Sequence, residues 1–438
     1  MRLKSVVLFI ICFFMAGCQQ TPDSIVVVNK SHNILDTLEE SDSYIYQAPA
    51  SIQFSEKKNG LDISYNATIH VPQVSAYSVI EVEKETYSDQ DYQMLMNYFE
   101  PNKRWFNRPA LTKNEILEML SYHQTNDYLS SNDEYINMLK DRLLTAPDKA
   151  ELIEFHFDTC RKNEMFIACC ENNNATLSSF LANYQGNDFQ YIRADRCTIM
   201  REEYLEFNDP YSKHFKTSPQ IGYEAAAKVA EKVLADIGID SSMKLLYAEK
   251  AIAIKSQNVI AFGWDFVYTR DCNGLRSPFI DNFDIWNNTP MPSNAAPWEM
   301  ECLFITIDEH GVFRIDYRGA GNQTKVLKEN ISLLSFENIL RRISQQLVYQ
   351  HAYYDKSIED IAIVVNEINM VSSLIDMKDN PNKGIVIPSW HVIYTLISTG
   401  KDGKATHFKL NTLFSAIDGS YIEPRISMDD IKNIYANE

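Results

Sequence analysis

The sequence predicts an α+β protein made of repeated modules, in each of which one helix packs on an antiparallel sheet. Two observations lead to this prediction. An order of one helix followed by several strands occurs twice, over residues 219–320 and 332–425. Apolar residues recur every three or four positions in the expected helices, and at every second position in an expected strand at Ile63–Val71, as the two geometries require. The repetition indicates a duplicated structural unit.

The helix of the first module is expected from Tyr223 to Ile237, where apolar residues form an unbroken stripe. Gly238 follows as the left-handed residue that commonly ends a helix. A loop at 273–298, rich in Asn and Pro, is too long for a plain connection and is a candidate functional loop. The strands of this module are expected at 243–255, 258–270, 302–307 and 312–317.

The helix of the second module is expected to begin after Ser335, an N-cap residue. Phe336, Ile339, Ile343 and Leu347 then share one helical face. The strands that follow are expected at 361–375, 385–397 and 407–417.

The preceding chain is expected to form a separate α+β domain. Asn59-Gly60 between two strand candidates predicts a hairpin. Ser88–Asp91 and Thr112–Glu115 each place an acid three residues after a hydroxyl N-cap, which is typical of a helix start. The complete division predicted is a signal peptide at 1–17, a tether at 18–48, an N-terminal α+β domain at 49–215, and modules at 216–330 and 331–438.

Cys18 ends a short export signal. Arg2 and Lys4 precede an apolar run, and Met15-Ala16-Gly17-Cys18 closes it, as in the lipobox of bacterial lipoproteins. The run has about ten residues, too few for a membrane-spanning helix. We expect a diacylglyceryl anchor on Cys18 that holds the protein at the extracytoplasmic face of the cell membrane. The alternative is a secretory signal with an incidental cysteine.

The net charge and the spacing of the cysteines argue against several classes of function. The formal charge of −18 disfavours nucleic acid, whose binding depends on Lys and Arg. Cys-x-x-Cys is absent from the sequence, so neither a zinc ribbon nor a thioredoxin-like site is indicated. Cys272 and Cys302 flank the long loop and are the candidates for a disulfide; the alternative is two buried thiols.

Catalytic and metal-binding motifs are not found in the sequence. It contains no Gly-x-Ser-x-Gly, no phosphate-binding loop and no His-Glu-x-x-His. Ser389 and His391 share a strand face but are interpreted as packing rather than a catalytic dyad. Asp281 and Asp284 lack the spacing of a calcium loop. We therefore expect no catalysis, no cofactor and no metal.

Two segments could form an interaction surface. Lys103, Arg104 and Arg108 surround the aromatic pair Trp105 and Phe106 in an otherwise acidic chain. The alternative is that the aromatics pack inward beneath the cationic side chains.

Phe283 and Trp286 form the second candidate, within the 273–298 loop. Exposed, they would be an interaction patch; packed on the sheet, they would be core.

A family resemblance follows from these segments. Gly222–Gly238, Phe266–Arg270 and Asn273-Gly274, with Leu334–Glu337, Ile387–Trp390 and Ala416–Gly419, resemble a group of uncharacterised Firmicutes lipoproteins. The modules also look like PepSY-type modules and the YycH/YycI-like extracytoplasmic regulators of a sensor kinase. The resemblance implies binding and regulation at the membrane surface without catalysis. Those regulators resemble proteins with a transmembrane helix, whereas a lipid is expected here.

The leading hypothesis is therefore a lipid-anchored extracytoplasmic binding or regulatory protein of the bacterial cell envelope, with membrane lipid and an unidentified protein as its partners. Two alternatives remain. A small-ligand or peptide receptor would have a deep apolar pocket. An envelope hydrolase would have buried acids with perturbed pKa values in one cleft.

Overall fold

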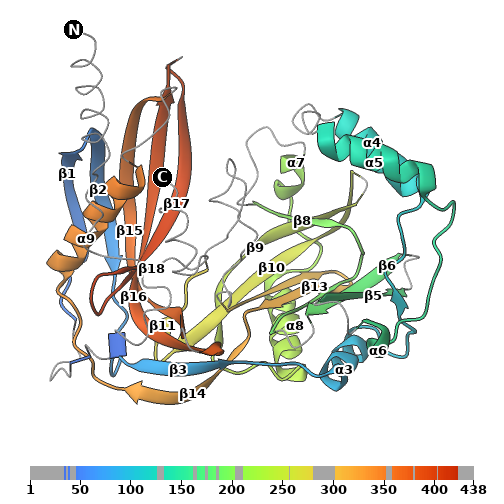
Figure 1. Ribbon diagram of the computed structural model, residues 1–438, viewed down its shortest axis with the longest axis horizontal. Coiled ribbons are helices and arrows are strands. Elements are labelled where there is room, and N and C mark those ends of the chain that lie inside the picture. The colour runs from blue at the N-terminus through green and yellow to red at the C-terminus, as the bar shows by residue number, and fades with distance from the viewer. Residues whose placement is uncertain are drawn as a thin grey trace, which may run out of the picture. The chain divides into compact units, whose positions relative to one another are not determined.

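The computed structural model describes residues 34–35, 38–39, 46–125, 133–160, 165–172, 176–183, 187–202, 211–255, 257–279, 301–351, 358–377, 380–401 and 403–422. The chain divides into two compact units. Unit 1 consists of residues 1–82, 273–298 and 324–438, and unit 2 of residues 83–272 and 299–323. Each unit has helices packed on an extensive, mainly antiparallel sheet, so the predicted α+β class is confirmed (Figure 1).

The sheet of unit 2 follows the order β4-β5-β6-β7-β13-β12-β10-β9-β8, with antiparallel neighbours throughout. Its strands are β4 (Phe106–Asn107), β5 (Met165–Glu171), β6 (Leu177–Asn183), β7 (Phe189–Ile192), β8 (Thr198–Arg201), β9 (Met243–Lys255), β10 (Asn258–Cys272), β12 (Cys302–Asp308) and β13 (Gly311–Arg318).

Helix α8 (Tyr223–Asp236) packs against β10, β12 and β13. Ala226, Ala230 and Val233 are its buried residues, and the two alanines allow a close approach to the sheet. The helix ends as predicted, because Gly238 has a left-handed φ of 75°. The other helices of unit 2 are α3 (Asp89–Phe99), α4 (Lys113–Thr125), α5 (Asp133–Thr145), α6 (Phe157–Cys160) and α7 (Ser212–Phe215).

The sheet of unit 1 follows the order β1-β2-β15-β16-β17-β18, and β3 pairs with both β14 and β16. Its strands are β1 (Ser51–Lys58), β2 (Leu61–His70), β3 (Val79–Lys84), β14 (Gly321–Lys328), β15 (Ile358–Met377), β16 (Asn380–Gly400), β17 (Ala405–Ser415) and β18 (Tyr421–Ile422). A two-residue strand, β11 (Leu275–Arg276), lies at the start of the 273–298 segment.

Helix α9 (Phe336–His351) covers one face of this sheet (Figure 1). Phe336 meets Trp390 with ring centroids 5.4 Å apart, and Nε2 of His351 lies 2.9 Å from the hydroxyl of Tyr394. Trp390 and Tyr394 both belong to β16 and are four residues apart, so they point to the same face.

The duplicated order of elements is confirmed by the strand pairing. In unit 2, α8 precedes the sequential antiparallel strands β9, β10, β12 and β13. In unit 1, α9 precedes the sequential antiparallel strands β15, β16, β17 and β18. Each helix packs on a sheet that includes the strands that follow it.

The chain is grouped differently from the three predicted domains, because pairing joins distant strands. Tyr191 of β7, in the predicted N-terminal domain, is opposite Ile315 of β13, in the first predicted module. Ile63 of β2 is opposite Ile363 of β15 in a parallel pair, across the predicted boundary with the second module. The domain limits at 215 and 330 therefore do not follow the sheets.

Part of the predicted tether at 18–48 also belongs to unit 1, since Ile34 is 1% exposed and Tyr46 packs on Trp390. Within the ranges the structure describes, no helix is long and apolar enough to cross a bilayer.

Candidate functional site

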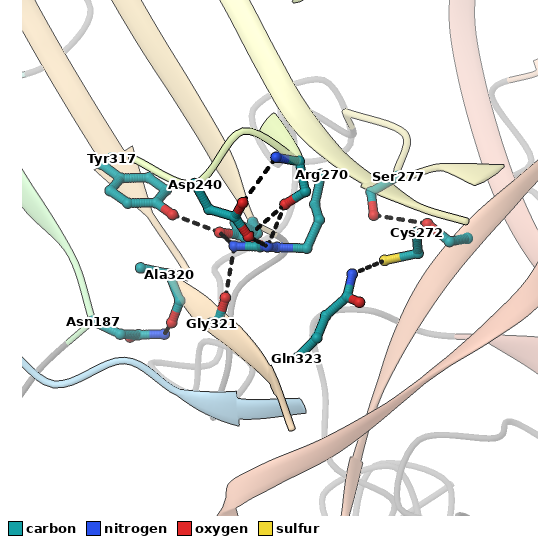
Figure 2. A network of polar contacts seen from close by, with 12 residues as sticks. Asn187, Asp240, Arg270, Cys272, Ser277, Tyr317, Ala320, Gly321 and Gln323 are labelled. Atoms are coloured by element: carbon teal, nitrogen blue, oxygen red, sulfur yellow. Dashed lines mark hydrogen bonds and ion pairs between the residues drawn. The ribbon is translucent and has the colours of Figure 1, made fainter. Parts of the chain in front are cut away.

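The most extensive polar network in unit 2 surrounds Arg270, near the end of β10 (Figure 2). The residue is 3% exposed, yet all five N–H groups of its guanidinium have acceptors. Nη1 donates to Oδ2 of Asp240 at 2.9 Å and to Oγ of Ser242 at 2.6 Å. Nη2 donates to Oε1 of Glu301 at 2.7 Å and to the carbonyl oxygen of Gly321 at 2.6 Å, and Nε donates to Oε2 of Glu301.

The acceptors come from separate parts of the chain. Asp240 and Ser242 lie between α8 and β9, Glu301 precedes β12, and Gly321 begins β14. Burial opposes the charged guanidinium, but hydrogen bonding to Glu301 raises the pKa of Arg270 above its usual value. Arg270 therefore joins four segments and has no donor left for a ligand.

The carboxylates of the network also accept hydrogen bonds from other residues of the protein. The hydroxyl of Tyr317 donates to Oε1 of Glu301 at 2.6 Å. Asp240 accepts the backbone N–H of Ser242 at 3.0 Å, and this bond lowers the pKa of Asp240.

Glu85 lies near the charges of this network. Burial, followed by the charge of Glu301, raises the pKa of its carboxyl group. Its backbone N–H donates to the carbonyl oxygen of Ala320 at 3.0 Å, which fixes the chain at this point. Raised carboxyl pKa values are common at catalytic acids, but the second carboxylate here, Glu301, is already bound by Arg270 and Tyr317.

A second charged cluster lies on one face of the same sheet. The guanidinium carbons of Arg201, Arg314 and Arg318 lie 4.5, 5.3 and 5.5 Å from the ring centroid of Phe304. Asp316 accepts hydrogen bonds from Arg314, Arg318 and Gln190. Burial opposes ionisation of Asp316, but Arg314 and Arg318 lower its pKa to about 2.

Asp265 completes this cluster. It is fully buried and accepts from Nε of Arg201 and from the hydroxyl of Thr306, both at 2.6 Å. Three arginines thus face three acids, Asp265, Asp316 and the more distant Glu249. The layer is balanced in charge, so its pairs neutralise each other.

A polar stripe in unit 1 differs because one buried atom of each of its three residues has no hydrogen bond. Asn369 of β15 is opposite His391 of β16, and Asn411 of β17 is diagonal to it. Oδ1 of Asn369, Nε2 of His391 and Oδ1 of Asn411 are buried without hydrogen bonds. Burial lowers the pKa of His391 to about 4, so the imidazole is neutral near pH 7.

Ser389 and His391 do share a face, as predicted, but they do not form a dyad. The hydroxyl of Ser389 donates to the carbonyl oxygen of Ile387 at 3.3 Å. Within the described residues, no group of three or more His, Cys, Asp or Glu side chains could hold a metal ion.

The predicted cationic and aromatic segment is largely part of the fold. Trp105 is 7% exposed and belongs to the core of unit 2, and Phe106 is opposite Cys169 in the β4–β5 pair. Arg104 lies over the ring of Phe106 at 5.7 Å, and Arg108 forms an ion pair of 2.9 Å with Asp195. The aromatics thus pack inward, while Lys103 remains half-buried beside them.

The other predicted sites are placed as follows. Phe283, Trp286 and the lipidation residue Cys18 lie outside the described residues. Cys272 and Cys302 are both buried and are not joined by a disulfide, contrary to the prediction.

The strand register explains the absence of this bridge. Cys302 is opposite Thr269, so Cys272 lies three residues, or about 10 Å, further along β10 and points to the other face. A disulfide requires Cα atoms roughly 4.4–6.8 Å apart.

The Arg270 network was missed because its members are far apart in sequence. A signal for the Phe304 cluster was present: Arg314, Asp316 and Arg318 occupy alternate positions of one strand and therefore share a face.

No protein-family model matches the chain, and no curated protein matches it. Among solved structures, it is similar to an uncharacterised protein from Eubacterium rectale, with 14% identity, a TM-score of 0.47, and coverage of 90% of this chain and 99% of the other. It is also similar to the C-terminal domain of YpeB from Bacillus megaterium, with 9% identity, a TM-score of 0.28, and coverage of 77% and 97%. Neither likeness assigns a function to this chain.

Proposed function

We propose that this protein is a lipid-anchored binding or regulatory protein of the bacterial cell envelope, without catalytic activity. The observation that carries the proposal is the apolar run ending in Met15-Ala16-Gly17-Cys18. A lipidated Cys18 would hold both units at the extracytoplasmic face of the membrane, where a protein partner would be bound.

The polar networks support a binding role over a catalytic one. A catalytic group needs a donor, an acceptor or a proton that is available to the substrate. All five N–H groups of the Arg270 guanidinium donate hydrogen bonds to acceptors of the protein itself. Asp316 accepts hydrogen bonds from Arg314, Arg318 and Gln190. These charges stabilise the sheet of unit 2 rather than face a substrate.

The anchor is tested by replacing Cys18. Cys18→Ala should move the protein from the membrane fraction to the medium, or leave an unprocessed precursor, while the parent protein incorporates labelled fatty acid. Cys302→Ala is the matched control, since it removes a buried thiol without touching the signal. An unchanged membrane fraction for Cys18→Ala would exclude the lipid anchor.

The partner is tested by crosslinking in intact cells, with photoreactive residues placed one at a time on exposed positions of each unit. Positions 98 and 223 suit unit 2 and position 54 suits unit 1, because Tyr98, Tyr223 and Phe54 are exposed. Reproducible capture of one protein from neighbouring positions, and not from the other unit, would support a specific binding surface. Equal capture of abundant envelope proteins from every position would contradict it.

Glu85 favours the envelope hydrolase as a second candidate, because its pKa is raised. In a hydrolase, Glu85→Gln should abolish turnover of ester or glycoside substrates. In a binding protein, the same change should leave partner capture intact. It should also stabilise the fold near neutral pH, because it removes a carboxyl group whose ionisation burial disfavours.

A further inference from the structure

Strand β1 forms one edge of the unit 1 sheet, and no other strand of the described ranges pairs with its outer side (Figure 1). The amide of Ile69 in β2 donates to the carbonyl oxygen of Ala50 at 2.9 Å. The pairing with β2 continues from there without a register shift, so the even-numbered residues of β1 bond to β2. The open side therefore presents the N–H and C=O groups of four alternate residues, Ser51, Gln53, Ser55 and Lys57.

This edge lacks the features that usually prevent an edge strand from pairing. Such strands are commonly short, bulged, interrupted by proline or lined with charges. β1 has eight residues in continuous register and no proline. Its charged residues lie at one end, and each has a partner in the same chain. Lys57 Nζ lies 3.1 Å from Oδ2 of Asp62. Lys58 Nζ lies 2.8 Å from Oε2 of Glu56. At the opposite end of the same order, the sheet finishes with the two-residue strand β18.

An exposed aromatic ring lies near the middle of this edge. Phe54 is 41% exposed, although its ring stacks on that of Tyr65 with the centroids 4.3 Å apart. Its neighbours Gln53 and Ser55 are also exposed. An aromatic side chain on an added strand would cover the exposed part of the Phe54 ring, as aromatic pairs across strands do.

We infer that β1 is the contact surface for a second copy of this chain, whose β1 pairs with it antiparallel about a twofold axis at Phe54. Ser51 of each copy is then opposite Lys57 of the other. Gln53 is likewise opposite Ser55, so the outward N–H and C=O groups of all four residues have partners. The two Phe54 rings meet on the axis. This inference goes beyond the proposed function and does not depend on the lipid anchor.

Other registers satisfy the edge less well. A shift of two residues in one direction places Lys57 opposite Pro49, which has no N–H to donate. The opposite shift places Ser51 opposite Asn59, which belongs to the hairpin turn. The register centred on Phe54 alone uses the whole strand, so the edge is complementary to itself.

The charges of β1 do not oppose this pairing. Lys57 is opposite Ser51, and Glu56 is opposite Ile52, so no like charges face each other. One strand pair involves far fewer residues than the roughly 20–30 per partner of a stable interface. We therefore expect a weak, reversible dimer, which disulfide trapping can accumulate.

Phe54→Cys tests the register in the purified full-length protein under mild oxidation. Across the axis, the two Cα atoms of this position would lie roughly 4.5 Å apart, within the reach of a disulfide. Ser55→Cys is the matched control, because this exposed neighbour would lie about 8 Å from its copy, which is too far. Phe54→Cys should form linked dimers about tenfold faster than Ser55→Cys or the parent chain, whose own cysteines give the background.

Proline separates strand pairing from chance collision. Gln53→Pro removes an N–H that points to the open side and makes no bond to β2, so β1 should still form. Added to Phe54→Cys, it should slow dimer formation about tenfold, because two intermolecular hydrogen bonds are lost, one in each copy. Gln53→Ala keeps the N–H and should leave the rate nearly unchanged. Should Gln53→Pro fail to fold, Ser55→Pro removes the other central outward N–H and makes the same test.

Three results would overturn the inference. Equal trapping of Phe54→Cys and Ser55→Cys would show that the contact is random collision. A rate that a folded proline variant does not change would show that the copies do not pair through backbone hydrogen bonds. Trapping of Phe54→Cys in intact cells to a different protein, and not to itself, would assign this edge to a strand of that protein.

Discussion

Arg270→Met should be among the most destabilising single changes in unit 2. The substitution keeps a long side chain but removes all five N–H donors, so the acceptors around it lose their partner. Glu301 suffers most, because its side chain is only 10% exposed, whereas the side chain of Asp240 is 52% exposed and can regain water.

The expected magnitude follows from these exposures. Removing one partner of a buried ion pair costs about 3–5 kcal/mol, because the remaining charge stays buried. The bonds to Ser242 and Gly321 add about 1 kcal/mol each, and the exposed Asp240 adds little. Relaxation and entry of water reduce the total, so we expect a loss of about 4 kcal/mol in the free energy of unfolding of unit 2.

Hydrogen exchange during a urea series is the suitable assay. A chain of two units need not unfold in one step, so amides of β10 and β12 are followed separately from those of β16. The free energy of unfolding measured at amides of β10 and β12 should fall, and that measured at amides of β16 should not change.

Two further variants test whether the Arg270 network stabilises unit 2. Arg104→Met removes an exposed arginine that lies over Phe106, and it should cost less than 1 kcal/mol. Arg270→Met with Glu301→Met removes both charges, so the double variant should lose less than the sum of the single variants. A cost below 1 kcal/mol for Arg270→Met, or strict additivity with Glu301→Met, would show that the network does not stabilise unit 2.

Four further outcomes are expected. Gly263→Ala should cost more than about 3 kcal/mol in thermal or urea unfolding, because its Cβ would lie 1.9 Å from the carbonyl oxygen of Ile307, and a nearly neutral result would contradict this close approach. Asp316 has a folded pKa of about 2 against an ordinary 3.8, so its contribution of roughly 2 kcal/mol is present above pH 4 and lost as the pH falls to 2; Asp316→Asn should flatten this part of the acid-unfolding curve. Peptide mapping after alkylation of the unfolded, unreduced protein should recover Cys272 and Cys302 as thiols, and a linked pair of peptides would overturn the register argument. His391→Leu should change stability by less than about 1 kcal/mol, because the buried imidazole is neutral and its Nε2 makes no hydrogen bond, and a loss above about 2 kcal/mol would show that its interaction with Asn411 stabilises the sheet.

Local patterns predicted the helices and turns because the signals lie within a few residues of one another. Thr112 and Glu115 exchange hydrogen bonds as a capping box, with Glu115 N–H donating to the hydroxyl at 3.3 Å and Thr112 N–H donating to the carboxylate at 2.8 Å. Asn59 and Gly60 both have positive φ, as their hairpin requires. In each case the residues that carry the signal also make the contact.

Strand partners across the chain could not be predicted in this way. Nothing in residues 61–70 indicates a parallel pair with β15, almost 300 residues later. The predicted domain limits divide the chain into consecutive stretches, whereas β2 pairs with β15 and β7 pairs with β13, both from the second half of the chain. The same separation hid the Arg270 network, since Asp240, Glu301 and Gly321 meet only after the sheet has formed.

The two faces of the unit 2 sheet show why the buried charges fit a structural role. Alternation along β12 sends Leu303, Ile305 and Ile307 to the face that packs with α8, and Phe304 and Thr306 to the face with the arginines. An apolar layer alone would leave the order of strands on the second face weakly specified, because apolar contacts are non-directional. Contacts between strands, such as Arg201 with Asp265 and Gln190 with Asp316, are satisfied only in one register, so they specify that register at a desolvation cost. A binding protein that presents a fixed surface to a partner gains from such rigidity, because a preorganised surface loses less freedom on association.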